Sequence, residues 1–438
     1  MVLTMLKNGL AYKFFITRIL MSHADVCCDC IVSGGLCILN TTTYNRKAQI
    51  ALFFTIATLF FISIASYTPF VTPYAQGLGL SPSAIGTALG ATGMASLLTR
   101  FPVGVMSQLL KRKKVMMQIG LLIVFSWILV MLFPSFGTLY IAKAMGGITG
   151  ATWVMYTAMF PSYFKEEDLP KSIGIIQLAS SIGPLIAANA GGYFAALYGF
   201  EYAFEVAMAA AGLGLVLSLF LKEPQAAESV EPKEALQIAK NQLTNKNAWI
   251  IGLFAMVAMM TTYAGVDYLV PVLVGNMGGE AFELTMVTNA FRIFGMIAAP
   301  ICGFVFYKKL GLVKTIAISG VLTGLAAIAC PYSPNFMVLY SLQAMIGFCF
   351  NVNITALMAL VIMGVSAKEK PARMGLYQSI YSIGFMIGPM TSGRLAETQP
   401  LEVNYLVMGA AIIIAGLLAK PLLPKKLIAK TKEEQSLS

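Results

Sequence analysis

Twelve apolar runs, each roughly twenty residues or longer, follow one another along most of this chain. A helix rises about 1.5 Å per residue, so each run is long enough to cross the roughly 30 Å hydrocarbon core of a bilayer. The runs lack the two-residue alternation of membrane β-strands. Hydrophobic residues make up 58% of the chain and charged residues 11%, far below the charged share of about 25% in soluble domains. We therefore predict an all-α integral membrane protein with twelve transmembrane helices, at approximately 49–75, 82–108, 115–133, 137–164, 171–198, 200–221, 247–275, 283–307, 313–331, 335–365, 373–397 and 402–423.

One short stretch of sequence, here called the duplicated phrase, occurs twice in the chain, 200 residues apart. The two copies are identical at seven of fourteen positions, whereas composition alone predicts about one identical position. The matched residues are Pro134, Phe136, Leu139, Tyr140, Ala144, Met145 and Gly147, which recur as Pro334, Phe336, Leu339, Tyr340, Ala344, Met345 and Gly347. A second echo relates Gly174, Gln177 and Ser181 to Gly375, Gln378 and Ser382. This duplication predicts two pseudo-symmetric six-helix bundles with the working site between them.

The net charge of +11 is distributed as a topology signal. Lys and Arg gather in every second connection, whereas the alternate connections near 76–81, 134–136, 276–282 and 331–335 carry none. Cytoplasmic connections of membrane proteins carry this excess of basic residues. With an even number of spans, both termini are predicted to be cytoplasmic. We expect a multi-pass protein of the plasma (inner) membrane that binds no nucleic acid.

The predicted organisation has five parts. They are an N-terminal extension at 1–46, a six-helix bundle at 47–222, a cytoplasmic linker with a short amphipathic helix at 223–246, a second bundle at 247–424 and a cytoplasmic tail at 425–438. The extension holds four of the seven cysteines and the single histidine: His23, Cys27, Cys28, Cys30 and Cys37. These residue types bind zinc, but their spacing matches no zinc-finger pattern well. We expect a disordered extension or a start assigned too far upstream, and neither a metal site nor a cofactor.

Basic residues inside the spans are the first candidates for a site. Arg100 and Arg394 lie nearer helix ends, where long side chains can snorkel to the membrane surface. Lys143 and Arg292 lie about 14 Å and 24 Å from the ends of their helices. A charge at that depth is costly unless it faces a polar cavity or a partner. For both residues the interpretations are contact with an anionic substrate or an internal contact with protein groups, and for Lys143 proton coupling is a further interpretation.

Asp267 is the clearest acid within the spans, one helical turn before Pro271. It is interpreted as a proton-coupling carboxylate, as a gate that pairs with Arg292, or as an outer-rim hydrogen-bonding group.

Uncharged polar and aromatic residues extend the candidate site. Gln343, Asn351 and Asn353 lie along one apolar span, and Gln343 aligns with Lys143 in the repeat. Tyr263 and Tyr381 are further candidates for substrate contact. The alternative for all five is packing or hydrogen bonding between helices, which contributes about 0.6 kcal/mol per bond in membranes.

The loop after the second span resembles a motif of the major facilitator superfamily, Gly-x-x-x-Asp-x-x-Gly-Arg-Lys. Here Gly104, Arg112 and Lys113 match, and Gln108 replaces the acid, which removes the charge of the lock that the motif forms in the family. Lys143 before Gly147 is similar to the family's Arg-x-x-x-Gly element, an intramembrane Arg is similar to that of oxalate/formate and monocarboxylate porters, and the 375–393 glycines resemble the antiporter motif. The resemblance covers about residues 47–424.

These features predict a secondary transporter that works by alternating access, and not an enzyme, since no His lies in the spans. The expected substrate is a small organic anion, moved by proton coupling or exchange through a monomer. The alternatives are a proton-coupled drug or multisubstrate efflux antiporter and, from another class, a membrane receptor or channel.

Overall fold

A computed structural model describes residues 46–110, 113–164, 169–223, 231–301, 306–366 and 368–423. The expectations for residues 1–45, for Arg112 and for the 425–438 tail fall outside these ranges. Within them every regular element is a helix, and helical stretches occur at each of the twelve predicted spans. Seven of the stretches are long and apolar enough to cross a membrane by length and composition alone.

The first half contains six helical stretches. They are α3 (Arg46–Ala65) with η1 (Thr68–Phe70) and α4 (Val71–Gly77), α5 (Pro82–Leu109), α6 (Lys113–Ile123) with η2 (Val124–Ser126) and α7 (Trp127–Leu132), α8 (Phe136–Ala151) with α9 (Trp153–Met159) and η3 (Phe160–Tyr163), α10 (Leu169–Tyr198) and α11 (Tyr202–Leu219).

The second half repeats the pattern after α12 (Pro232–Leu243), which lies in the predicted linker. Its stretches are α13 (Lys246–Tyr263) with η5 (Ala264–Leu269) and α14 (Val270–Asn276), α15 (Ala281–Ile301), α16 (Tyr307–Leu310) with α17 (Leu312–Ala329) and η7 (Cys330–Tyr332), α18 (Phe336–Ile362), α19 (Lys370–Thr398) and α20 (Leu401–Leu422). The η5 segment is a π-helical turn, a feature that often marks functional sites.

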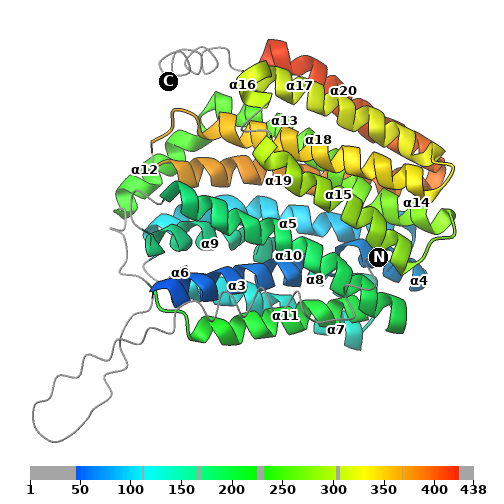
Figure 1. Ribbon diagram of the computed structural model, residues 1–438, viewed down its shortest axis with the longest axis horizontal. Coiled ribbons are helices and arrows are strands. Elements are labelled where there is room, and N and C mark those ends of the chain that lie inside the picture. Colours follow the sequence, from blue (N-terminus) through cyan, green and yellow to red (C-terminus); the bar gives the residue numbers. More distant parts are fainter. Residues whose placement is uncertain are drawn as a thin grey trace, which may run out of the picture. The chain divides into compact units, whose positions relative to one another are not determined.

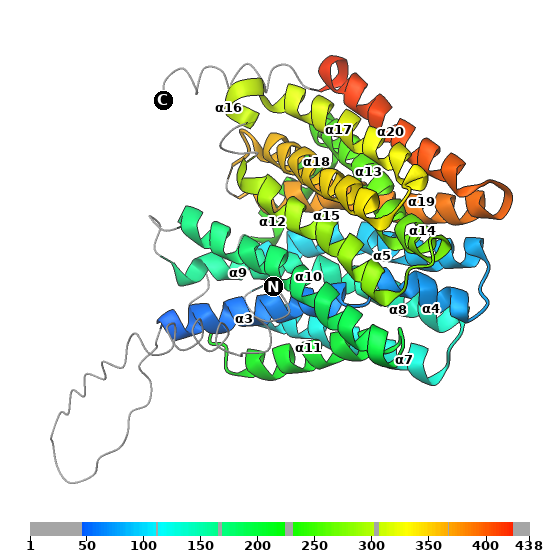
Figure 2. The ribbon, with the colours of Figure 1, turned by 45° about the vertical axis from the view of Figure 1, so that its right-hand side comes forward.

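The two halves pack their helices in equivalent pairs. α5 packs on α8 as α15 packs on α18, and α3 packs on α10 as α13 packs on α19. The halves meet along two seams, α5 against α19 and α10 against α15. Figures 1 and 2 show α3, α10 and α11 grouped on one side and α17, α18 and α20 on the other, with α5 and α19 side by side at the junction.

In each half the duplicated phrase caps a helix and allows that helix to approach its neighbour closely. Ser135 caps α8 in a capping box with Thr138, and the equivalent Asn335 caps α18 through the Val338 N–H. Glycine at the end of the phrase lets the capped helix approach its neighbour. A Cβ atom at Gly147 would lie 2.3 Å from the Thr92 carbonyl oxygen on α5, and one at Gly347 would lie 2.0 Å from the Phe291 carbonyl oxygen on α15.

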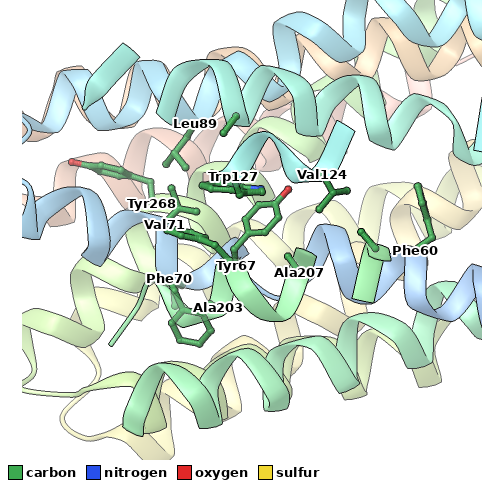
Figure 3. Packing of buried hydrophobic residues seen from close by; sticks show 14 of the residues in the cluster. Phe60, Tyr67, Phe70, Val71, Leu89, Val124, Trp127, Ala203, Ala207 and Tyr268 are labelled. Atoms are coloured by element: carbon green, nitrogen blue, oxygen red, sulfur yellow. The ribbon is translucent and has the colours of Figure 1, made fainter. Parts of the chain in front are cut away.

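Aromatic packing holds the interior of the first half together. Trp127 stacks on Phe204 with ring centroids 4.3 Å apart. The Tyr67 ring lies 4.3 Å from the Trp127 ring, and Figure 3 shows these two side chains next to each other. All three side chains are buried. This cluster joins α7, α11 and the end of α3, and it presents Tyr67 toward the space between the halves.

Candidate functional site

A cavity of about 480 Å³ lies between the two halves. Its wall combines aromatic rings with polar and charged side chains from both bundles. The aromatic residues are Phe61, Tyr67, Tyr263, Phe291, Phe350 and Phe385, and the polar residues include Thr92, Ser96, Arg100, Lys143, Gln177, Ser180, Ser181, Thr262, Asp267, Arg292, Asn351 and Thr355. Such a mixed wall is typical of a site for a small organic molecule.

A buried ion pair joins the halves at this cavity. Lys143 Nζ lies 3.7 Å from Asp267 Oδ2, and the two side chains are only 4% and 5% exposed. Their backbones are also anchored across helices, because the Thr92 hydroxyl donates to the Lys143 carbonyl oxygen and the Thr72 hydroxyl donates to the Asp267 carbonyl oxygen. Lys143 comes from α8 and Asp267 from the π-helical turn. The sequence alone offered Arg292 as a partner of Asp267; the structure places Lys143 there.

Arg292 lines the same cavity from α15. Among the described residues, no carboxylate oxygen lies within 4.0 Å of its guanidinium nitrogens. Asn351 lies on the neighbouring helix α18, and Gly295, one turn after Arg292, leaves the space that the Asn351 amide fills. Arg292 therefore offers hydrogen-bond donors in this part of the cavity wall, while Asn351 Nδ2 already donates to the Gly347 carbonyl oxygen at 2.9 Å. Asp267 interacts electrostatically with Arg292 from beyond ion-pair distance.

Of the remaining candidate residues, some line the cavity and others make contacts between helices. Tyr263 lines the cavity and stacks on Phe385 with centroids 3.8 Å apart. Gln343 is buried and its Nε2 lies 3.5 Å from Cys330 Sγ. Asn353 donates to the Ile316 carbonyl oxygen at 2.9 Å and to Ser319 Oγ at 3.1 Å. Two residues rotate a helix by about 200°, so Asn353 faces α17 when Asn351 faces the cavity.

Arg100 is the main residue whose place the sequence did not predict. Instead of snorkelling to the surface, it lines the cavity, about 14 Å from the end of α5 at Leu109. Its Nη1 donates to Gln378 Oε1 at 2.8 Å and to the Tyr381 hydroxyl at 3.1 Å. Tyr381 thus touches the site through Arg100. Gln378 and the cavity residue Gln177 occupy equivalent positions in the repeat. This match is the sequence feature that indicates the location of the Arg100 contacts.

The loop motif is described in part. A Cβ atom at Gly104 would lie 3.2 Å from the Cα of Gly375, so this glycine serves the α5–α19 seam. Lys113 begins α6. The side chain of Gln108 and all of Arg112 fall outside the described part of the chain.

Cross-bundle contacts close the end of the molecule that lacks basic connections. Asn189 and Asn289 exchange amide hydrogen bonds of 3.2 Å and 3.0 Å between α10 and α15. Near the same end, the Ser83 N–H donates to Glu397 Oε1 at 3.2 Å between α5 and α19. Deeper in, α10 and α15 contribute Ser181 and Gly295 to the cavity wall. The two helices therefore contact each other between the cavity and the end that lacks basic connections, and they line the cavity deeper in the molecule.

Two equivalent helix bundles with a polar cavity at their junction are the architecture of many secondary transporters. The family model described as Major Facilitator Superfamily matches residues 53–312 and 305–437. The chain belongs to that superfamily, and it is an integral membrane transporter and not an enzyme.

Two of the similar proteins are named as nucleoside transporters. The chain is 25% identical over 276 residues to the purine ribonucleoside efflux pumps NepI of Escherichia coli and of Shigella flexneri, covering 62% of this chain and 68% of each pump. Among solved structures, nucleoside transporter NupG matches with a TM-score of 0.70 at 13% identity, over 85% of this chain and 98% of that one. A bacterial homologue of the lysosomal transporter Spinster, in an inward-facing and unoccupied conformation, matches with a TM-score of 0.66 at 15% identity, over 89% and 98%. These structural likenesses show the shared fold.

Proposed function

We propose that this transporter moves a small organic anion by alternating access and that Arg292 anchors the substrate. The observation that carries the proposal is the contrast between two deep cations. Lys143 has a carboxylate partner 3.7 Å away, whereas Arg292 lines the cavity without a carboxylate within 4.0 Å among the described residues. Asp267 acts on Arg292 only from beyond ion-pair distance. A guanidinium without a direct carboxylate partner is costly in a membrane-embedded cavity, and a bound carboxylate would offset that cost through a bidentate contact.

The cross-bundle contacts support alternation between two states. If the basic connections lie in the cytoplasm, the Asn189–Asn289 pair closes the outer end in this conformation. The halves at 47–222 and 247–424 would then rock about the cavity, with the 223–246 linker and both termini on the cytoplasmic side of the plasma (inner) membrane. Since one chain supplies the whole cavity wall, a monomer suffices.

The Lys143–Asp267 pair is the proposed coupling element. It is the one ion pair at the cavity among the described residues, and it connects the bundles directly. Opening the outer end requires α8 and the η5 turn to move apart, which would separate the charges. Protonation of Asp267, or arrival of a substrate anion at Lys143, would lower the cost of that separation, and so would support either proton coupling or exchange.

A nucleoside is the second candidate, favoured by the names of the relatives. The cavity offers aromatic faces such as Phe61 and Phe385, together with the amides of Gln177 and Asn351. Rings stack on bases and amides hydrogen-bond to them. On this reading Arg292 would donate to a neutral acceptor on the base or sugar.

One experiment separates the two candidates. Purified protein is screened by thermal shift against monocarboxylates, dicarboxylates and purine ribonucleosides, and the stabilising compounds are tested for counterflow in proteoliposomes. For an anion substrate, Arg292→Gln should lower uptake at least about tenfold. The matched control Arg394→Gln, at an exposed position, should transport normally. Stabilisation by nucleosides alone, with uptake retained in Arg292→Gln, would overturn the anion proposal in favour of the nucleoside.

A further inference from the structure

Arg100 has too few partners for a purely structural residue. Nη1 uses its hydrogens on two neutral acceptors, Gln378 and Tyr381. Nε is buried and has no hydrogen-bond partner among the described residues. Nη2 faces the cavity-lining residue Gly150, whose added Cβ atom would lie 3.4 Å away. No carboxylate of the described residues lies within 4.0 Å.

The charge balance of the cavity points the same way. Its wall contains three cations, Arg100, Lys143 and Arg292, and one described anion, Asp267. One carboxylate, Asp267, faces three cations: it pairs directly with Lys143 and acts on Arg292 from a greater distance, so the cavity keeps an excess of positive charge among the described residues. The rings of Tyr381 and Phe385 lie 5.4 Å and 5.7 Å from the Arg100 guanidinium carbon. This cation–π contact contributes about 1–2 kcal/mol, which does not replace a full counter-charge.

The two guanidinium-bearing residues lie at different depths. From the outer helix starts, Arg100 is about 27 Å along α5 and Arg292 is about 16 Å along α15. The stacked pair Phe385 and Tyr263 belongs to the wall of the same cavity. Two cations offset by about 10 Å along one cavity fit an elongated solute with an acceptor group at each end better than a compact anion with one.

Resting on the proposed anion function, we infer that Arg100 is a second substrate-binding residue and that the substrate is a linear dicarboxylate, with one carboxylate on Arg292 and the other on Arg100. The Nη2 hydrogens of Arg100 can donate charge-assisted hydrogen bonds to a carboxylate oxygen. Nη2 lies beside the cavity-lining Gly150 and has no partner among the described residues, whereas Nε is covered by protein atoms and Nη1 stays on α19.

The test compares succinate with butyrate, which has the same number of carbons and one carboxylate fewer. Binding is measured by thermal shift and by competition on purified protein, for wild type, Arg100→Gln, Arg292→Gln and the exposed control Arg394→Gln. We expect wild type to prefer succinate. Arg100→Gln should weaken succinate binding about tenfold to hundredfold, the loss expected for charge-assisted hydrogen bonds, and leave butyrate binding unchanged. Arg292→Gln should weaken both.

The outcomes are separable. Failure of wild type to bind either carboxylate overturns the anion function itself. Binding of butyrate without a preference for succinate, or equal losses for both ligands in Arg100→Gln, leaves the anion function standing and overturns the role of Arg100, which would then only lock α5 to α19. If Arg100→Gln does not fold, Arg100→Lys provides the test, because it keeps the positive charge but lacks the planar guanidinium. We expect it to weaken succinate binding selectively and by a smaller factor. Equal weakening of succinate and butyrate binding refutes the inference.

Discussion

Removing one charge of the Lys143–Asp267 pair is predicted to destabilise the fold by several kcal/mol. The charged atoms are 3.7 Å apart, and at an effective dielectric constant of about 20 their attraction is roughly 4–5 kcal/mol. Both side chains are at most 5% exposed, so water does not screen the charge that is left. Breaking such a pair from one side costs about 3–5 kcal/mol. We expect Lys143→Met and Asp267→Asn each to lose an amount in this range.

The double variant Lys143→Met/Asp267→Asn should recover much of the loss, because it leaves no unpaired charge. Apolar replacement of both partners of a buried pair is often neutral. The free energy of unfolding is measured by denaturant titration in mixed micelles for the wild type, both single variants and the double variant, which closes a double-mutant cycle. The exposed pair Lys368–Glu234, with side chains 67% and 44% exposed, is the matched control and should show a coupling energy below about 1 kcal/mol.

Additive losses in the cycle for Lys143 and Asp267 would refute this reasoning. A coupling energy no larger than that of the Lys368–Glu234 control would mean that the two charges are solvated in the protein, and that the pair does not hold the halves together.

Two further predictions concern close contacts between helices. Gly347→Ala should destabilise the protein by about 1–3 kcal/mol, since its Cβ atom would lie 2.0 Å from the Phe291 carbonyl oxygen, whereas Gly265→Ala, with nothing within 4 Å, should be close to neutral; equal melting temperatures for the two variants would contradict the close approach of α18 to α15. A disulfide formed from Asn189→Cys and Asn289→Cys should abolish transport, and reduction should restore it, because it holds α10 against α15 where the two amides now meet. Continued transport by the oxidised protein would show that this seam does not open during the cycle.

Much of the architecture follows from local pattern. Helices were predicted where the structure has them, from α5 after the Ser81 cap to α18 after the Asn335 cap. Apolar length and capping are properties of short segments, so they can be seen without knowing what a helix packs against. The repeat placed Gly147 and Gly347 at equivalent positions, and in the structure both lie at close helix contacts.

The candidate site depended on the direction of each side chain around its helix. Lys143, Asp267 and Arg292, singled out as charges within the spans, all line the cavity in the structure. Depth alone did not separate Asn351, which lines the cavity, from Asn353, which bonds to α17. Only the packing of α18 between α15 and α17 determines which face is turned inward.

The sequence by itself therefore determined an all-helical, duplicated membrane transporter with fixed charges deep in its spans, because hydrophobic length, repetition and the cost of burying charge are written along the chain. The tertiary structure decided which charges meet. In the structure Asp267 pairs with Lys143, Arg292 has no carboxylate within 4.0 Å among the described residues, and Arg100 lies in the cavity wall against α19. These partners lie on different helices, and their distances depend on the rotation and spacing of helices that close glycine contacts bring together.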